Sequence, residues 1–263
     1  MNEEKISREA LRKLVAGTLF AEHIQAFDEI DSTNSAAMLA AQAGAAEGSV
    51  FLAERQTGGR GRGGNTWHSE KGAVMLSVIL RPRVSAGDVL ILSLATGLAA
   101  SAAVEEVCGI LPDLRWPNDI LLGEKKLGGI LCELNIDAGK VRHAVIGIGI
   151  NVNQEKFPEE ISAVATSIQQ ETGKPWPRVD LAAALLHNLD GEYREMQTAP
   201  IEAMRSCIKR FEERSTYARG KRVKIAEGGG FEGVTAGLDK RGFLRVKTAS
   251  GERVVMSGGV RPA

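Results

Sequence analysis

The sequence of 263 residues has little of several features that would narrow its function at once. Its 33 basic and 33 acidic side chains cancel to a formal charge of +0, and only 5% of its residues are aromatic. This balance argues against a surface dedicated to nucleic acid. The three cysteines are scattered, without the C-x-x-C spacing of a zinc site or a disulfide framework, so we expect a reducing, cytoplasmic environment.

A long apolar segment is also missing. The N-terminus has no basic region followed by an apolar one, which is the mark of a secretory signal. The longest uncharged run, Val89–Val104, is shorter than the roughly 20 residues that span a membrane, and it contains serine, threonine and glycine. We therefore expect a buried helix there and no membrane partner. The remaining composition allows one large globular domain and a small second one.

What the sequence does contain is a glycine- and arginine-rich stretch, Gln56–Trp67, which reads QTGGRGRGGNTW. Bare backbone amides and two guanidinium groups offer many hydrogen-bond donors, as a bound phosphate requires. The stretch matches G-x-G-x-x-G, but a strand pattern rather than a helix follows it, so a dinucleotide fingerprint is not supported. No Lys-Ser or Lys-Thr closes it, which excludes a Walker loop. A flexible surface loop and an RNA-binding arginine–glycine segment remain open.

Strand patterns flank this glycine–arginine loop, at 50–54 before it and at 74–80 after it. The second strand alternates in polarity and is expected to be half-buried. Ahead of the loop, Ser7 is placed to cap a first helix, a strand is expected at 24–30, and the helix 35–43 follows the polar residues of DSTN at 31–34. Capping by Ser32 or Thr33 is the simplest structural role for those residues.

Two later stretches bring glycine and polar residues next to strands. The segment RWPNDILLGEKKLGGILCEL predicts a β-hairpin with arms at 120–122 and 127–134. In the strand 141–153, period two places isoleucine and valine on one face and glycine and asparagine on the other. A bare strip of this kind suits a flat ligand lying on the sheet, or else another chain segment crossing closely. The residues of that strip are Gly147, Gly149, Asn151 and Asn153.

The C-terminal part of the chain changes in pattern. Two amphipathic helices are predicted, one from Asp180 and one from Pro200, with Ile201, Met204, Ile208 and Phe211 on the buried side of the second. Beyond about Ser215 the pattern becomes short strands separated by turns, as in a small barrel.

Four motifs therefore stand in a fixed order: DSTN at 31–34, the glycine–arginine loop, RWPNDILLGEKKLGGIL at 115–131 and GIGINVN at 147–153. As a set they resemble the biotin protein ligases, also called biotin-[acetyl-CoA-carboxylase] ligases. The resemblance implies an α+β fold, with a central mixed sheet flanked by helices and a small Src-homology-like β-barrel at the C-terminus. The domains would be 1–216 for catalysis and 217–263 for the barrel. The short stretch before the first motif leaves no room for the DNA-binding domain of larger members, so no DNA partner is expected.

The resemblance also implies a reaction. Biotin and ATP, accompanied by Mg²⁺, would form biotinyl-AMP, and a lysine of the biotin carboxyl carrier protein would then attack the mixed anhydride. Carried over by motif, the catalytic residues would be Lys126, Arg62 and Asp119. The biotin-binding residues would be Ser32, Thr33, Asn34, Gln56, Gly59, Arg60, Gly61, Arg62, Lys126, Gly129 and Gly147. The ATP-binding residues would be Arg62, Trp67, Asn118, Lys126 and Asn151.

The chemistry itself favours such residues. Adenylation brings a carboxylate to a phosphate, so Arg62 and Lys126 would offset the repulsion between two anions, and Mg²⁺ would act at the other phosphates without a cage of protein ligands. The loop would be mobile when empty and close over the ligand. The sequence departs from the family pattern at one position: the family commonly has a further arginine after Gly64, and this chain has Asn65 there. A lipoate-protein ligase is the nearest alternative, and a homodimer is compatible with either.

Overall fold

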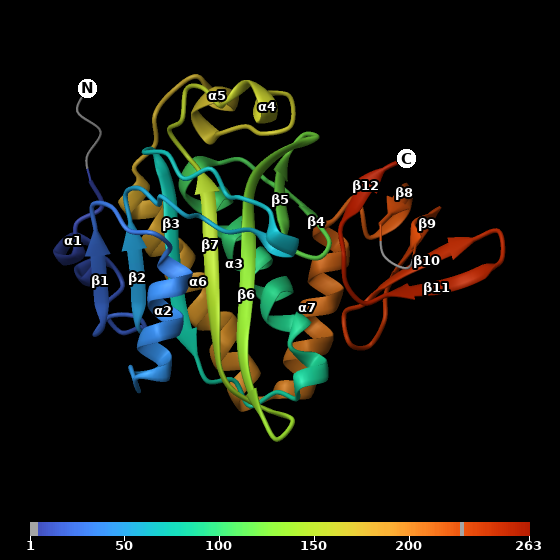
Figure 1. Cartoon of the computed structure of the whole chain (residues 1–263), viewed down its shortest axis with the longest axis horizontal. Coiled ribbons are helices and arrows are strands. Elements are labelled where there is room, and N and C mark those ends of the chain that lie inside the picture. Colours follow the sequence, from blue (N-terminus) through green and yellow to red (C-terminus); the bar gives the residue numbers. More distant parts are fainter. Residues whose placement is uncertain (1–4, 227–228) are drawn as a thin grey trace.

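The computed structural model describes residues 5–226 and 229–263. Within these residues, seven strands form one mixed sheet in the order β1-β2-β3-β7-β6-β5-β4 (Figure 1). Only the β1–β2 pair is parallel. The strands are β1 (Ile24–Phe27), β2 (Val50–Ala53), β3 (Ala73–Leu80), β4 (Asp113–Arg115), β5 (Asp119–Leu122), β6 (Lys125–Asp137) and β7 (Lys140–Asn151).

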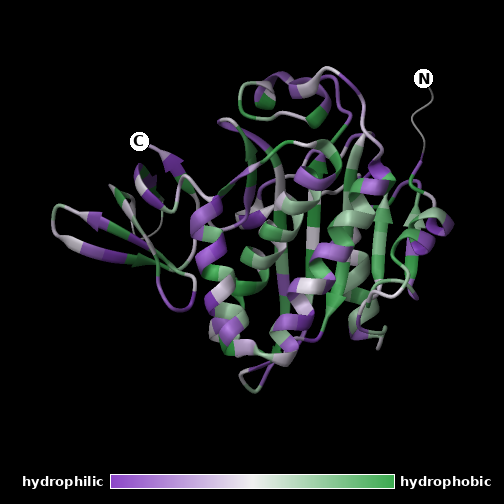
Figure 2. Ribbon diagram, turned by 180° about the vertical axis from the view of Figure 1, so that it is seen from behind, coloured by the Kyte–Doolittle hydropathy of each residue, from purple (hydrophilic) through white to green (hydrophobic). Residues whose placement is uncertain are grey.

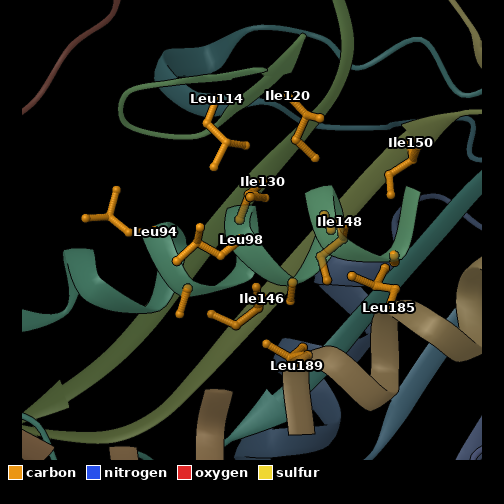
Figure 3. Close-up of a cluster of buried hydrophobic side chains, with 14 of the residues drawn as sticks. Leu94, Leu98, Leu114, Ile120, Ile130, Ile146, Ile148, Ile150, Leu185 and Leu189 are labelled. Carbon is orange, nitrogen blue, oxygen red and sulfur yellow. The ribbon is translucent and has the colours of Figure 1, made fainter. Parts of the chain in front are cut away.

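Three long helices cover one face of this sheet: α3 (Leu90–Cys108), α6 (Arg178–Thr198) and α7 (Pro200–Arg214). Figure 2 shows the molecule from the side of these helices. Their outward surfaces carry many hydrophilic residues, and the strands behind them are mostly hydrophobic. The core lies between the two layers, where leucines of α3 and α6 meet isoleucines of β6 and β7 (Figure 3). Burial of this apolar area is the main stabilising contribution to the fold.

Helix α3 is long and apolar enough to cross a membrane by length and composition, but 72% of its most apolar window is buried inside the fold. Helix α3 itself has apolar residues on all of its faces, because α6, α7 and the sheet all pack on it. It ends at Gly109, whose φ of 67° provides the left-handed C-cap. The prediction of a buried helix over Val89–Val104 is confirmed.

The opposite face of the sheet is covered by α2 (Thr33–Gln42), which packs on β2, β3 and β7. Its alanines Ala37 and Ala41 lie against Phe51, Ile79 and Val145. Strand β3 is therefore buried along its whole length. The expectation that it is half-buried was wrong, because α2 and the glycine–arginine loop cover its second face.

Shorter helices complete this part of the chain. Ser7 caps α1 (Arg8–Leu14) by accepting from the amide of Ala10, as its sequence predicted. The helices α4 (Glu159–Ser162) and α5 (Ile168–Thr172) lie beyond the end of β7 (Figure 1). The remaining helical turns are 3-10 segments at Arg62–Gly64 and Ala86–Asp88.

The C-terminal strands form a second antiparallel sheet in the order β11-β10-β9-β8-β12, which stands beside β4 and α7 (Figure 1). It corresponds to the small barrel expected from the sequence. A turn predicted at 228–230 lies partly outside the described residues, and the division at 216/217 stays a prediction. The strands are β8 (Arg219–Ile225), β9 (Phe231–Leu238), β10 (Leu244–Thr248), β11 (Gly251–Val255) and β12 (Val260–Pro262).

This second sheet is attached to the first by specific hydrogen bonds. The indole of the buried Trp116 donates to the carbonyl of Gly242 at 2.9 Å. Arg241 donates to Asp88 at 3.1 Å, and Arg62 of the glycine–arginine loop donates to the carbonyl of Gly258 at 3.3 Å. The C-terminal sheet therefore reaches the neighbourhood of the glycine–arginine loop.

The predicted helices and strands are otherwise found near their expected positions. Pro200 begins α7 at its first turn, as predicted. The placement of Ile201 on the buried side was wrong, since this side chain is 61% exposed. The buried residues of α7 are Ala203, Cys207 and Phe211, and Ile201 lies outside the helix face that they share.

Candidate functional site

A cavity of about 490 Å³, open solvent at its mouth included, lies on the α2 face of the sheet. The floor is formed by β3, β6 and β7, one wall by the start of α2, and the roof by the glycine–arginine loop, which crosses in front of the sheet (Figure 1). The lining residues are Ser32, Thr33, Asn34, Gln56, Arg60, Gly61, Arg62, Trp67, Met75, Asn118, Lys126, Gly129, Ile130, Leu131, Gly147, Ile148 and Gly149.

One end of the cavity is a dense network of uncharged hydrogen-bonding groups. Ser32 caps α2 through the amide of Ser35, so its hydroxyl sits at the helix start. The side-chain oxygen of Gln56 accepts from the amide of Thr33 at 2.7 Å and from its hydroxyl at 3.1 Å. The hydroxyl of Ser77, fully buried on β3, lies 2.8 Å from that of Thr33. This end can both donate and accept hydrogen bonds while excluding water.

The glycine strip of β7 forms the floor, and side chains lie directly over it. A Cβ added at Gly147 would lie 2.1 Å from Oδ1 of Asn34, and one added at Gly149 would lie 2.6 Å from the ring of Trp67. Both positions therefore require glycine, since such approaches are closer than any real Cβ makes. The atoms over these two glycines belong to side chains, so the alternative of another backbone crossing the strip is not found here.

The glycine–arginine loop has a defined conformation. The amide of Gly61 donates to the carbonyl of Asn65 at 2.7 Å, and the amide of Trp67 donates to Gly59 at 3.0 Å. The side chain of Asn65 donates to the carbonyl of Arg62 at 2.7 Å, which closes the turn. Asn65 therefore has a structural contact of its own at the position where an arginine was expected from the resemblance.

The other end of the cavity is cationic. Arg62 donates to the side-chain oxygen of Asn118 at 3.2 Å, and Asn118 is itself fixed by donating to the carbonyl of Ile130 at 2.8 Å. Partial burial lowers the pKa of Arg62, although the charge of Asp119 opposes this effect. An arginine in this setting still remains a cation at neutral pH.

Lys126 completes this end. Its ammonium nitrogen lies 2.5 Å from Oδ1 of Asp119, whose other oxygen accepts from Arg115 at 2.6 and 3.1 Å. Burial raises the pKa of the Asp119 carboxyl, but Lys126 and Arg115 outweigh it, so the net pKa lies below its usual value of 3.8. Asp119 is thus an anion that holds Lys126. The same ammonium lies 5.8 Å from the ring of Trp67.

The chain was compared with known proteins. Residues 26–151 match the biotin/lipoate A/B protein ligase family, and residues 219–260 match the biotin protein ligase C terminal domain. The bifunctional ligase/repressor BirA of Bacillus subtilis is 34% identical over 260 residues, which cover 97% of this chain and 79% of that protein. The chain belongs to the biotin protein ligase family.

Other biotin protein ligases agree over most of their length. The biotin-[acetyl-CoA-carboxylase] ligase of Mycobacterium tuberculosis is 33% identical over 239 residues, covering 87% of this chain and 84% of that one. The structure of the biotin protein ligase from Aquifex aeolicus in complex with biotin and ATP superposes with a TM-score of 0.79 at 31% identity, covering 92% of this chain and all of that one.

Most of the residues predicted from the resemblance to biotin protein ligases do lie together. Of the predicted set, only three are not among the lining residues of the cavity. Gly59 lies in the roof, where a Cβ would lie 2.4 Å from the hydroxyl of Ser69. Asp119 stands behind Lys126. The buried side chain of Asn151 is engaged with Thr166 and Gln154, so it braces the segment after β7.

Several residues of the site were not predicted as site residues. Met75 and Ser77 on β3 occupy the sheet floor or its polar end, and period two on this strand could have found them. Glu133 could not be found this way, because it is identified by Arg60, a partner far away in the sequence. Arg115 pairs with Asp119, four residues further on, across the β4–β5 hairpin.

Proposed function

We propose that this protein is an ATP-dependent ligase that activates biotin as biotinyl-5′-AMP and transfers it to a lysine of the biotin carboxyl carrier protein of acetyl-CoA carboxylase. One observation carries the proposal: a single cavity joins an enclosed network of uncharged hydrogen-bonding groups to a cationic end with Arg62 and Lys126. The biotin- and ATP-bound relative from Aquifex aeolicus supports the same substrates.

The uncharged end suits the ureido ring of biotin, which presents two N–H donors and one carbonyl acceptor. Gln56, Thr33 and Ser32 at this end supply hydroxyl, amide and carbonyl groups within a short distance of one another. Lipoate carries an apolar dithiolane ring instead, which cannot exchange hydrogen bonds with these groups. Because a site built to hydrogen-bond a substrate discriminates against an analogue that lacks the matching polar atoms, the cavity favours biotin over lipoate.

The cationic end suits the joining of two anions. The carboxylate of biotin must approach the α-phosphate of ATP, attack it through an oxygen, and displace pyrophosphate. Arg62 and Lys126 would offset the repulsion and stabilise the charge that develops on the phosphate, because they are fixed in advance by Asn118 and Asp119. Asp119 would position Lys126 in this scheme.

The adenine and ribose would lie towards Trp67 and Asn118, on the side of the cavity nearest the segment after β7. Trp67 already lies flat over the glycine strip, and its buried indole nitrogen has no hydrogen-bond partner among the described residues. A polar group of a ligand would satisfy this donor. The aromatic ring also offers a stacking surface for a nucleobase.

Mg²⁺ would accompany ATP. The described residues contain no group of three or more His, Cys, Asp or Glu side chains that could hold a metal ion. We therefore assign Mg²⁺ to the phosphates of the substrate, where it would neutralise the charge of the leaving pyrophosphate. Arg62 and Lys126 would then neutralise the negative charge of the biotin carboxylate and the α-phosphate.

The test is a transfer assay. The full chain is incubated with Mg²⁺, ATP, an acceptor carrier domain, and either radiolabelled biotin or radiolabelled lipoate. Label on the carrier from biotin and none from lipoate is the expected result. Transfer from lipoate alone would assign the protein to the lipoate branch, and the absence of both would refute the proposed reaction.

A further inference from the structure

Glu133 stands at the rim of the cavity on strand β6, where its side chain is 27% exposed. It does not line the cavity itself. Together with Leu131 it forms one side of an outer hollow, whose other side is the glycine–arginine loop from Thr57 to Thr66. The outer hollow shares Arg60, Gly61, Arg62 and Leu131 with the cavity, so Glu133 lies beside its rim.

One oxygen of this carboxylate binds two separate segments. Oε2 of Glu133 accepts from Nδ2 of Asn34 on α2 at 2.9 Å and from a terminal guanidinium nitrogen of Arg60 in the loop at 2.8 Å. Hydrogen bonds between charged groups are stronger than neutral ones. Helix α2, the glycine–arginine loop and strand β6 are therefore joined through a single oxygen atom of Glu133.

The contact to α2 determines how Asn34 faces the cavity. Nδ2 of Asn34 also lies 3.3 Å from the carbonyl of Leu131, so its amide hydrogens are directed towards β6. Oδ1 is left to face Ser77, at 2.6 Å, and the space above Gly147. Glu133 accordingly keeps an acceptor, and not a donor, on the floor at this point.

The hydrogen bond between Glu133 and Arg60 holds the glycine–arginine loop, which forms the roof of the cavity. Arg60 lines the cavity, and its guanidinium reaches across the mouth to β6. With Arg60 47% exposed, this pair is screened by water and contributes little to overall stability. The pair instead affects the equilibrium between the loop lying on the sheet and the loop moved away from it.

We propose that Glu133 is a positioning residue that ties α2 and the glycine–arginine loop to β6 and so retains the acyl-adenylate in the cavity. This inference rests on the proposed function. Without the tie the intermediate would escape into solution. There water attacks the acyl carbonyl, a new C–O bond forms, the bond to the phosphate oxygen breaks, and biotin, AMP and a proton are released.

The test compares Glu133→Gln with Asp137→Asn. Asp137 is a matched control, because it is an exposed carboxylate on the same strand that is paired with Arg142. In the absence of a carrier, we expect Glu133→Gln to increase biotin-dependent AMP release about tenfold, the factor that one charged hydrogen bond represents. The KM for biotin should rise, while kcat for pyrophosphate exchange stays within about twofold. Asp137→Asn should match the unmodified protein in all three measurements.

Two further variants complete the test. If Glu133→Gln does not fold, as judged by circular dichroism and melting, Glu133→Asp retains the charge but is too short to hold both partners, and it should leak in the same way. Arg60→Gln alone should also increase AMP release, because it removes the same tie from the side of the loop.

The outcomes separate the two proposals. Normal exchange in the unmodified protein, with AMP release unchanged by either Glu133 variant, overturns the role of Glu133 alone. A fall in kcat without increased AMP release also overturns it, since that pattern describes catalysis and not retention. No biotin-dependent exchange in the unmodified protein refutes both the tie and the proposed function.

Discussion

Replacing Lys126 by alanine removes the ammonium group that stands between Asp119 and the cavity. The pair is tight, at 2.5 Å, and Lys126 is only about one-third exposed, with a side-chain value of 34%. By analogy with the loss of one preorganised donor in other enzymes, the barrier to adenylation should rise by about 3–4 kcal/mol, which corresponds to a reaction slower by roughly 100- to 1,000-fold.

The fold should survive this change. Asp119 keeps both of its hydrogen bonds to Arg115 after the substitution, so no buried carboxylate is left alone. A partly exposed ion pair of this kind contributes about 1 kcal/mol or less to stability. The free energy of unfolding should therefore change far less than the activation free energy does.

The assay is biotin-dependent exchange of label between pyrophosphate and ATP, measured beside a urea titration. Lys125→Ala is the matched control, since Lys125 is the preceding residue of β6, is exposed, and points to the other face of the strand. Exchange by Lys126→Ala within about threefold of the unmodified protein would remove this lysine from the reaction. An equal loss in Lys125→Ala would show that the defect is not local to the cavity.

Three other perturbations test separate parts of the structure. Gly149→Ala should displace the ring of Trp67, which a Cβ would approach to 2.6 Å, and isothermal titration should show weaker binding of ATP; unaltered affinity contradicts the assigned stacking position. Gly191→Ala fills open space within α6 and should stabilise the protein by about 0.5–1 kcal/mol in urea, whereas a loss of stability would reveal a contact of the helix not seen here. Because the pKa of Asp119 is lower in the folded protein than its usual value of 3.8, its ion pairs stabilise the fold above pH 3.8, and this stability is lost as the pH falls through the lower folded pKa. Asp119→Asn should therefore make the free energy of unfolding depend less on pH in this acidic range. An unchanged pH dependence in the variant would show that the ion pairs of Asp119 do not cause it.

Much of the architecture is legible in the sequence because its strongest signals are local. Ser7 marks a helix start through its side-chain hydroxyl and Pro200 through its fixed backbone angle, and the hairpin of β5 and β6 follows from its turn. The glycine strip of β7 also follows from period two alone. Such features depend on neighbouring residues and need no knowledge of the tertiary fold.

The features that were missed depend on distant partners. Strand β3 reads as half-buried by its own alternation, yet α2 and the glycine–arginine loop cover its second face. Glu133 looks like any carboxylate on an exposed strand until Asn34 and Arg60 are brought to it from far along the chain.

The bond from Arg62 to the carbonyl of Gly258 has a practical consequence. A cation assigned to the reacting phosphate is held by a backbone carbonyl of the second sheet, just before β12. A substitution or insertion in the turn between β11 and β12 would therefore move the acceptor of this hydrogen bond. Changes made in the C-terminal sheet, far along the chain from the glycine–arginine loop, can in this way alter the position of Arg62.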